Sequence, residues 1–293
     1  MPLPDFTTQD NATYKASIDS TAADHETRIG DNETDIADHE TRTSDLEAIL
    51  DGAEVIGYAI KVGFYQSISI GVAGQDTGPE GVAFNSDGTT MYMVGAATAA
   101  VYQYALSTPW DVSTASASDS VSVSSEDGTP NGIAFKSDGT KMYMVGAVSD
   151  AVYQYTLSTP WDVSTASYDS VSSSVSSEDG SPEGITFKSD GTKMYMVGST
   201  NGAVYQYTLS TAWDLSTASY DSVSASVSSE DGIPTDIAFN SDGTNMYMVG
   251  LGNDAVHQYT LSTAWDLSTA SYDSVSFSVA SQEELPAGLA FKP

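Results

Sequence analysis

The acidic pairs of this sequence are the residues that could do chemistry, by holding a metal ion. Three pairs recur at intervals of 52 residues inside near-identical SSEDG segments, and they are Glu126-Asp127, Glu178-Asp179 and Glu230-Asp231. Carboxylate oxygens are the ligands that Ca²⁺ prefers in proteins. The pattern therefore has two interpretations, a Ca²⁺ site built by these loops or ordinary solvated loops. We favour the second, because acidic residues are common in turns.

Other patterns typical of catalysis are missing from the sequence. The three histidines cannot form a Ser-His-Asp set, because His25 and His39 fall in a predicted coiled coil and His257 replaces a repeated tyrosine. We find no P-loop, GxGxxG, HExxH or EF-hand pattern. The chain has no cysteine, which excludes a thiol nucleophile, a thiolate metal site and a disulfide framework. We therefore predict no catalytic residues, no enzyme activity and no cofactor beyond the Ca²⁺ discussed above or a buried anion.

The charge balance limits the partners. The chain carries 40 acidic against 9 basic residues, a formal net charge of −31. Such a field repels nucleic acids and anionic membrane surfaces. The sequence has no apolar run long enough to span a bilayer, and its first residues lack the basic and apolar regions of a signal peptide. We expect no nucleic-acid partner, no membrane insertion and no export by the ordinary secretory route.

These acidic pairs belong to an internal repeat that must position them. Phe135, Phe187, Phe239 and Phe291 recur every 52 residues, and Trp161, Trp213 and Trp265 share that interval. In the unit from 181 to 232, turn signals separate four short β-type runs, which are Gly184–Lys188, Met194–Val197, Val204–Leu209 and Tyr220–Val227. Four strands in a period near 50 are typical of a β-propeller blade. The sequence therefore predicts an all-β propeller of about 52-residue, four-stranded blades.

The predicted propeller covers residues 63–293, and its repeat count is incomplete. Four full units occupy residues 79–280, the preceding Phe64–Val72 matches a fourth strand, and the final Leu285–Pro293 matches a first strand. We expect the native chain to continue past residue 293 and to form more blades. The alternative is an open or four-bladed arrangement with spare strands.

The turns between the second and third predicted strands vary most among the units. Because the flanking strands are nearly identical, we expect ligand specificity to reside in these turns. The candidate residues are Ala96, Thr98, Val148, Asp150, Thr200, Asn201, Asn253 and Asp254. We interpret the repeated phenylalanines and most of the tyrosines as core. The four tryptophans have two interpretations, anchors for a long connection or platforms for carbohydrate stacking.

Residues 18–51 show a different period, in which ten positions, most of them apolar or small, are spaced alternately four and three residues apart. This is the a/d pattern of a coiled coil, which one chain cannot bury alone. We therefore predict a parallel homotrimer, with residues 52–62 as a linker and residues 1–17 as a short docking peptide. The predicted oligomerisation residues are Ile18, Ala22, His25, Ile29, Asn32, Ile36, His39, Thr43, Leu46 and Leu50.

The polar d positions of the predicted coiled coil have two interpretations. The Ile29-to-Asn32 spacing resembles the asparagine layers of trimeric autotransporter stalks and bacteriophage fibres, where three asparagines surround a buried anion. His25 and His39 could act alike when protonated. The alternative is that these residues only fix register and partner number. A metal site formed by the histidine layers is less favoured, because no carboxylate shares their layers.

Two resemblances add to these patterns. The segment GITFKSDGTKMYMVG, residues 184–198, resembles the core of the YVTN, NHL and TolB-like propeller families. That resemblance covers about half of each unit and implies blade architecture, but it says almost nothing about function.

The order of docking peptide, coiled coil and β-repeats resembles a bacteriophage tail fibre. This resemblance implies a trimeric virion fibre that is made in the host cytoplasm and acts outside the cell. It would bind other virion proteins through residues 1–17 and a host-surface glycan or protein through the propeller. The alternatives are a structural virion component, such as a head-decorating fibre or tail-tip protein, and a glycan-cleaving enzyme that uses carboxylates of the propeller face.

Overall fold

The structure is a computed structural model that describes residues 68–292, which belong to one compact unit, Ala59–Pro293. The described residues form four antiparallel sheets of four strands each, and within each sheet the strands pair in chain order. We call the sheets blades 1 to 4. The predicted coiled coil, docking peptide and linker lie outside the described residues and stay predictions. No helix among the described residues is long and apolar enough to cross a membrane.

The blades repeat the same strand lengths, except that the outermost strand of blade 1 is one residue shorter than the others. Blade 1 contains β1 (Pro79–Phe84), β2 (Thr90–Gly95), β3 (Ala100–Leu106) and β4 (Ala115–Ser122). Blade 2 contains β5 (Pro130–Phe135), β6 (Lys141–Gly146), β7 (Ala151–Leu157) and β8 (Ala166–Ser174). Blade 3 contains β9 (Pro182–Phe187), β10 (Lys193–Gly198), β11 (Ala203–Leu209) and β12 (Ala218–Ser226). Blade 4 contains β13 (Pro234–Phe239), β14 (Asn245–Gly250), β15 (Ala255–Leu261) and β16 (Ala270–Ser278).

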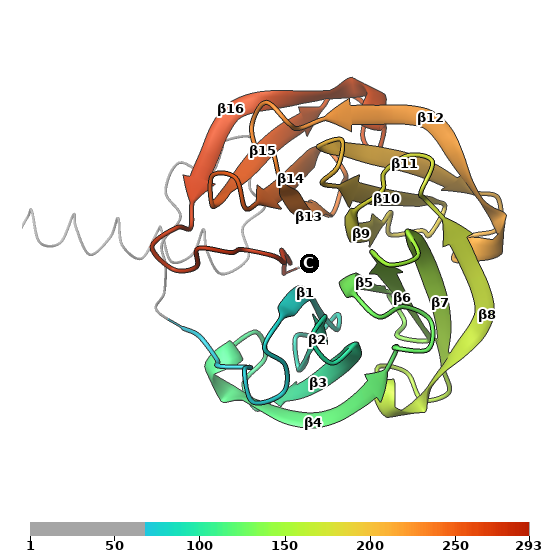
Figure 1. The fold of residues 1–293 in the computed structure, drawn as a ribbon, viewed down its shortest axis with the longest axis vertical. Helices are drawn as coiled ribbons and strands as arrows, with labels where there is room; N and C mark the ends of the chain where they lie inside the picture. The colour runs from blue at the N-terminus through green and yellow to red at the C-terminus, as the bar shows by residue number, and fades with distance from the viewer. Residues whose placement is uncertain (1–67, 293) are drawn as a thin grey trace, which may run out of the picture. The chain divides into compact units, whose positions relative to one another are not determined.

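The blades stand around a common axis, with β1, β5, β9 and β13 innermost and β4, β8, β12 and β16 outermost (Figure 1). Successive innermost strands lie side by side. The all-β propeller prediction is confirmed. In blade 3 the strands begin one or two residues before the predicted runs, because edge residues without a hydrophobic period still join the backbone ladder.

Short polar turns connect the first two strands of each blade. In blade 3, the Asp190 carboxylate accepts hydrogen bonds from the backbone N–H of Thr192 at 2.9 Å and from its hydroxyl at 2.6 Å. Gly191 follows with φ +73°, a conformation that glycine adopts without a steric penalty. The Ser-Asp-Gly-Thr segment therefore fixes the register in which Phe187 faces Met194.

Large aromatic side chains fill the junction between neighbouring blades. Tyr143 of blade 2 packs on Phe187 of blade 3, with ring centroids 4.4 Å apart, and Phe187 packs on Trp213 at 5.4 Å. Trp213 has φ +64°, which is unusual for a bulky residue. This conformation lays its indole over Gly191, where a Cβ would come within 2.3 Å of the indole nitrogen. The contact supports the interpretation of the tryptophans as packing anchors.

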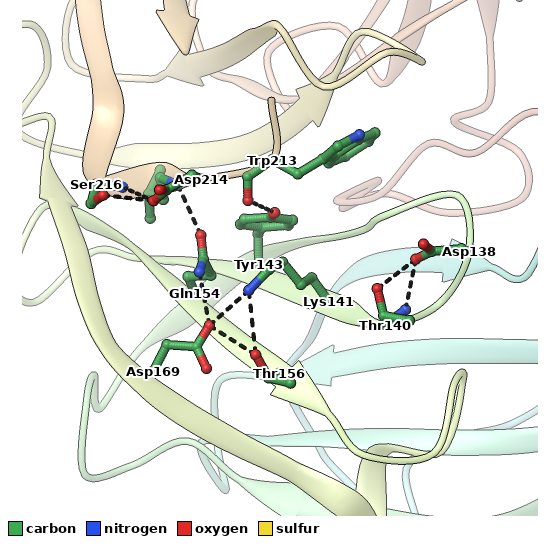
Figure 2. A network of polar contacts seen from close by, with 11 residues as sticks. Asp138, Thr140, Lys141, Tyr143, Gln154, Thr156, Asp169, Trp213, Asp214 and Ser216 are labelled. Carbon is green, nitrogen blue, oxygen red and sulfur yellow. Dashed lines mark hydrogen bonds and ion pairs between the residues drawn. The ribbon is translucent and has the colours of Figure 1, made fainter. Parts of the chain in front are cut away.

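A polar network joins the same two blades (Figure 2). Tyr143 donates its hydroxyl to the carbonyl of Trp213 at 2.6 Å, and Gln154 accepts the backbone N–H of Leu215 at 2.8 Å. Gln154 also donates to Asp169, which further accepts hydrogen bonds from Thr156 and Lys141. These contacts hold a long connection of blade 3 onto blade 2.

The same pair of inter-blade hydrogen bonds occurs at each junction between full blades. Tyr92 and Tyr195 donate to tryptophan carbonyls at 2.6 Å, as Tyr143 does. Gln103 and Gln206 accept the backbone N–H of the next blade's short 3-10 turn at 3.0 and 2.9 Å. The repeated tyrosine and glutamine are therefore junction residues.

A C-terminal segment, residues 286–292, runs inward between β13 and β1 without being a regular strand (Figure 1). Thr235 donates its hydroxyl to the Pro286 carbonyl at 2.9 Å, and Phe291 packs on Tyr247 with centroids 4.7 Å apart. On the other side, a Cβ at Gly288 would lie 3.0 Å from the Glu80 carbonyl. The segment therefore occupies the place of a fifth innermost strand, as its resemblance to a first strand predicted.

Candidate functional site

The candidate site lies where the innermost strands begin. At this end, loops 72–78, 123–129, 175–181 and 227–233 lead into the innermost strands, and the turns 96–99, 147–150, 199–202 and 251–254 lie beside them. We call this end of the propeller the loop face. It carries both the predicted metal residues and the predicted ligand-binding turns.

The aspartates of the predicted metal pairs tie these loops to the turns. Asp179 accepts the backbone N–H groups of Ser181 at 2.9 Å, Thr200 at 3.1 Å and Asn201 at 3.0 Å. Asp127 and Asp231 repeat this pattern, and all three are buried. Their carboxylates hold the local backbone in place.

The glutamates of the same pairs accept tyrosine hydroxyls. Glu126, Glu178 and Glu230 each receive such a bond at 3.1 Å, from Tyr155, Tyr207 and Tyr259. No group of three or more histidine, cysteine or acidic side chains within residues 68–292 is arranged to hold a metal ion. The three aspartates are therefore buried acceptors of backbone hydrogen bonds and not solvated loop residues, and a Ca²⁺ site at these pairs stays a prediction.

The predicted ligand-binding turns lie on the loop face, and many of their polar groups are already bonded. Thr98 donates its hydroxyl and its backbone N–H to Asp76, and Asn201 donates its amide to the Glu178 carbonyl. Val148, by contrast, is 67% exposed. The remaining predicted turn residues are Ala96, Asp150, Thr200, Asn253 and Asp254. Their role in binding stays a prediction.

A second set of polar residues, which the sequence-based reasoning did not select, lies at the start of the innermost strands. Each follows the proline that opens a strand, and together they are Glu80 of β1, Asn131 of β5, Glu183 of β9 and Thr235 of β13. We call this set the axial ring. The signal for it was present in the sequence, because this position changes from unit to unit while the proline before it does not.

Hydrogen bonds connect two neighbouring members of the axial ring, Asn131 and Glu183. Asn131 donates its amide to a Glu183 carboxylate oxygen at 2.7 Å and to the Pro182 carbonyl at 3.1 Å. The other Glu183 oxygen accepts the hydroxyls of Ser181 at 2.9 Å and Ser199 at 2.7 Å. Glu183 is therefore fixed by three donors while part of its surface stays accessible.

Glu80 has a different electrostatic environment. Burial raises the pKa of its carboxyl above the ordinary value, and the negative charges of Glu183 and Asp76 raise it further. No hydrogen bond ties the Glu80 carboxyl to another residue within 68–292. One carboxyl that retains its proton more readily thus lies near a second carboxyl that is held by donors, an arrangement suited to proton transfer.

The two ends of the propeller differ in charge. The lysines of the described residues lie at or next to the far ends of the innermost strands, as Lys136, Lys141, Lys188, Lys193 and Lys292. Among residues 68–292, the loop face has acidic side chains without a lysine or arginine. It therefore disfavours anionic ligands such as phosphorylated compounds.

No family model matches the chain, and no curated protein matches it. Among solved structures, a putative 6-phosphogluconolactonase from Bacteroides fragilis has a TM-score of 0.48 and 12% identity, and the match covers 72% of this chain and 56% of that one. A putative 6-phosphogluconolactonase from Bacteroides uniformis has a TM-score of 0.45 and 15% identity, with coverage of 65% and 55%. A periplasmic gluconolactonase from Pseudomonas aeruginosa has a TM-score of 0.45 and 12% identity, with coverage of 71% and 55%. The chain spans about 55% of the length of these neighbours.

These comparisons correct two predictions. The neighbours named above are described as lactonases, not as fibre or virion proteins, so the virion-fibre interpretation and the prediction of no enzyme activity are wrong. The physical cause of the error is that the repeats specify a propeller and not its use. The fibre interpretation depended on the order of segments, and its first segments lie outside the described residues.

Proposed function

We propose that the chain is a hydrolase of neutral, sugar-derived substrates, with Glu80 and Glu183 of the axial ring as its catalytic pair. The observation that carries this proposal is the axial ring itself, in which Asn131, Ser181 and Ser199 hold the Glu183 carboxylate in place while the partly buried Glu80 carboxyl, whose pKa burial raises, belongs to the same ring. Two carboxyl groups in different environments are a common arrangement for acid–base catalysis of hydrolysis.

Each member of the pair has a role in this proposal. Glu183 accepts a proton from a water molecule as that water attacks the substrate carbon. Glu80, in its protonated form, donates a proton to the oxygen that departs when the carbon–oxygen bond breaks. Asn131 and Ser199 orient Glu183. Such proton transfers typically accelerate a reaction by about 10²- to 10⁴-fold.

The charge of the loop face favours neutral substrates. An anionic substrate would approach Glu80, Glu183 and Asp76 without a lysine or arginine of residues 68–292 to neutralise it. Sugar lactones and neutral glycosides meet this condition, and phosphorylated lactones do not. The names of the structural neighbours make lactones the first compounds to test, while the proposal itself rests on the axial ring.

The test measures hydrolysis by the full chain of glucono-1,5-lactone, corrected for spontaneous opening, and of neutral nitrophenyl glycosides. Glu80→Gln and Glu183→Gln should each lower kcat by about 10²-fold or more, because each removes one proton transfer. Glu284→Gln is the matched control, since Glu284 is an exposed glutamate outside the axial ring. No hydrolysis of either class above background, or full activity in both axial variants, would overturn the proposal.

A further inference from the structure

Five chain segments close around the propeller axis, and four of them contribute a glycine at the same position. Gly81, Gly132 and Gly184 lie in β1, β5 and β9, and Gly288 lies in the C-terminal segment. Residue 236 of β13 occupies the fifth of these equivalent positions, 52 residues from both Gly184 and Gly288, and it is an aspartate. The axis is therefore closed by four glycines and one carboxyl.

Close backbone contact explains the glycines. A Cβ at Gly81 would lie 2.7 Å from the Asn131 carbonyl, and a Cβ at Gly132 would lie 2.7 Å from the Glu183 carbonyl. Real Cβ atoms do not approach backbone atoms so closely. At position 236 a Cβ is accommodated, and the side chain that it carries reaches the backbone of the C-terminal segment at Leu289.

Asp236 bonds this segment directly. One carboxyl oxygen accepts the backbone N–H of Leu289 at 2.8 Å, and the other accepts the N–H of Ile237 at 2.8 Å. The second oxygen also points at Gly184, where a Cβ would come within 2.3 Å of it. The carboxyl therefore sits in a buried space between β9, β13 and the segment.

We propose that Asp236 is a proton-sensitive latch that holds residues 286–292 in the propeller axis. The latch joins β13 to the C-terminal segment through Leu289, and Thr235 reinforces it through the Pro286 carbonyl. The segment in turn packs against the Glu80 backbone, so the latch also positions one edge of the axial ring.

The environment of the Asp236 carboxyl makes its bond to the C-terminal segment sensitive to pH. Burial raises the pKa of Asp236 to about 7, although the two backbone hydrogen bonds lower it. The ionisable groups on the elements packed around it are Glu183 of β9, Lys193 and Tyr195 of β10, Tyr247 of β14, Lys292 of the segment and Glu80 of β1. None of these groups is an electrostatic cause of the shift, which comes from loss of water around the carboxyl.

The sign of the pH dependence follows from the pKa of Asp236 in the docked and open states. When the segment leaves the axis, Asp236 is exposed and its pKa returns toward the ordinary aspartate value of 3.8. The docked state therefore binds the proton more tightly than the open state. Docking is strongest at low pH and weakens as the pH rises from about 4 to about 7.

The experiment is amide hydrogen exchange of the full chain between pH 5 and pH 8, corrected for the intrinsic pH dependence of exchange. The opening constant of the segment around Leu289 should rise about 10-fold or more between pH 5 and pH 7 and level off above pH 7. Strand β9 carries Gly184 at the equivalent position, and its opening constant should not follow that rise.

Two variants complete the experiment. Asp236→Asn should abolish the pH dependence of the segment, because an amide does not titrate in this range. Asp119→Asn removes the charge of an exposed aspartate of β4 and should leave the dependence unchanged. A flat wild-type profile, or a dependence that survives in Asp236→Asn, would overturn the latch. The wild-type profile stands as a test even if Asp236→Asn does not fold, and none of these measurements requires catalytic activity.

Discussion

The junction between blades 2 and 3 and the junction between blade 4 and the C-terminal segment use equivalent positions in different ways. In the first, Tyr143 and Gln154 reach the connection that carries Trp213 and Leu215. In the second, the equivalent Tyr247 packs on Phe291, and within residues 68–292 neither its hydroxyl nor the acceptor oxygen of Gln258 has such a partner. The difference shows that the strands of one blade do not form a junction alone. The connection of the next blade must supply the groups that the tyrosine and glutamine bond.

The largest expected effect comes from removing the aromatic side chain. Tyr143→Ala should lower the free energy of unfolding by about 3–5 kcal/mol, because Tyr143 is fully buried and packs on Phe187 and Trp213. Tyr247→Ala should cost less, because within residues 68–292 Tyr247 packs on one aromatic ring, that of Phe291, whereas Tyr143 packs on two. Urea unfolding of both variants checks the order, and equal losses would contradict the difference between the junctions.

An intermediate effect should follow from adding a methyl group at the axis. Gly132→Ala should destabilise the protein by about 1–3 kcal/mol, because the new Cβ would meet the Glu183 carbonyl at 2.7 Å and strands cannot separate without loss of packing. Asp236→Ala should cost less, because this position already accommodates a Cβ. Thermal unfolding of the two variants at one pH makes the comparison, and a larger loss in Asp236→Ala would refute it.

The smallest effect concerns the polar half of the junction. Gln154→Ala should cost about 1–2 kcal/mol, because it leaves the Leu215 N–H without its partner and removes one of the three donors to an Asp169 oxygen. Gln258→Ala loses the bond to Asp273 but no described bond to a following blade. We expect a smaller loss there in urea unfolding, and an equal loss would show that the inter-blade bond adds little.

Much of the fold could be predicted from the sequence, because it repeats. The Ser-Asp-Gly-Thr turn at 189–192 and the alternation around Ile185 and Phe187 determine where strands begin and which side is buried. The tryptophans at positive φ were harder to interpret. Their packing on the turn glycines follows from a long-range contact that no local pattern contains.

The candidate site was harder to predict for the same reason. Comparison of the repeats shows that the position after each strand-opening proline varies. It does not show that Asn131 at this position bonds Glu183 at the same position of the next innermost strand. The acidic pairs were considered as a Ca²⁺ site because two carboxylates are adjacent in the chain. Their aspartates, however, bind backbone N–H groups, a use that depends on the turns folding beside them.

The equivalence of the junctions between full blades has a consequence for the architecture. Since the tyrosine and glutamine of blades 1, 2 and 3 each bond the tryptophan-containing connection of the blade that follows, blades 2 and 3 could replace one another. A block of 52 residues could be duplicated or deleted between them without creating a new kind of contact. The propeller is in this sense modular along its chain.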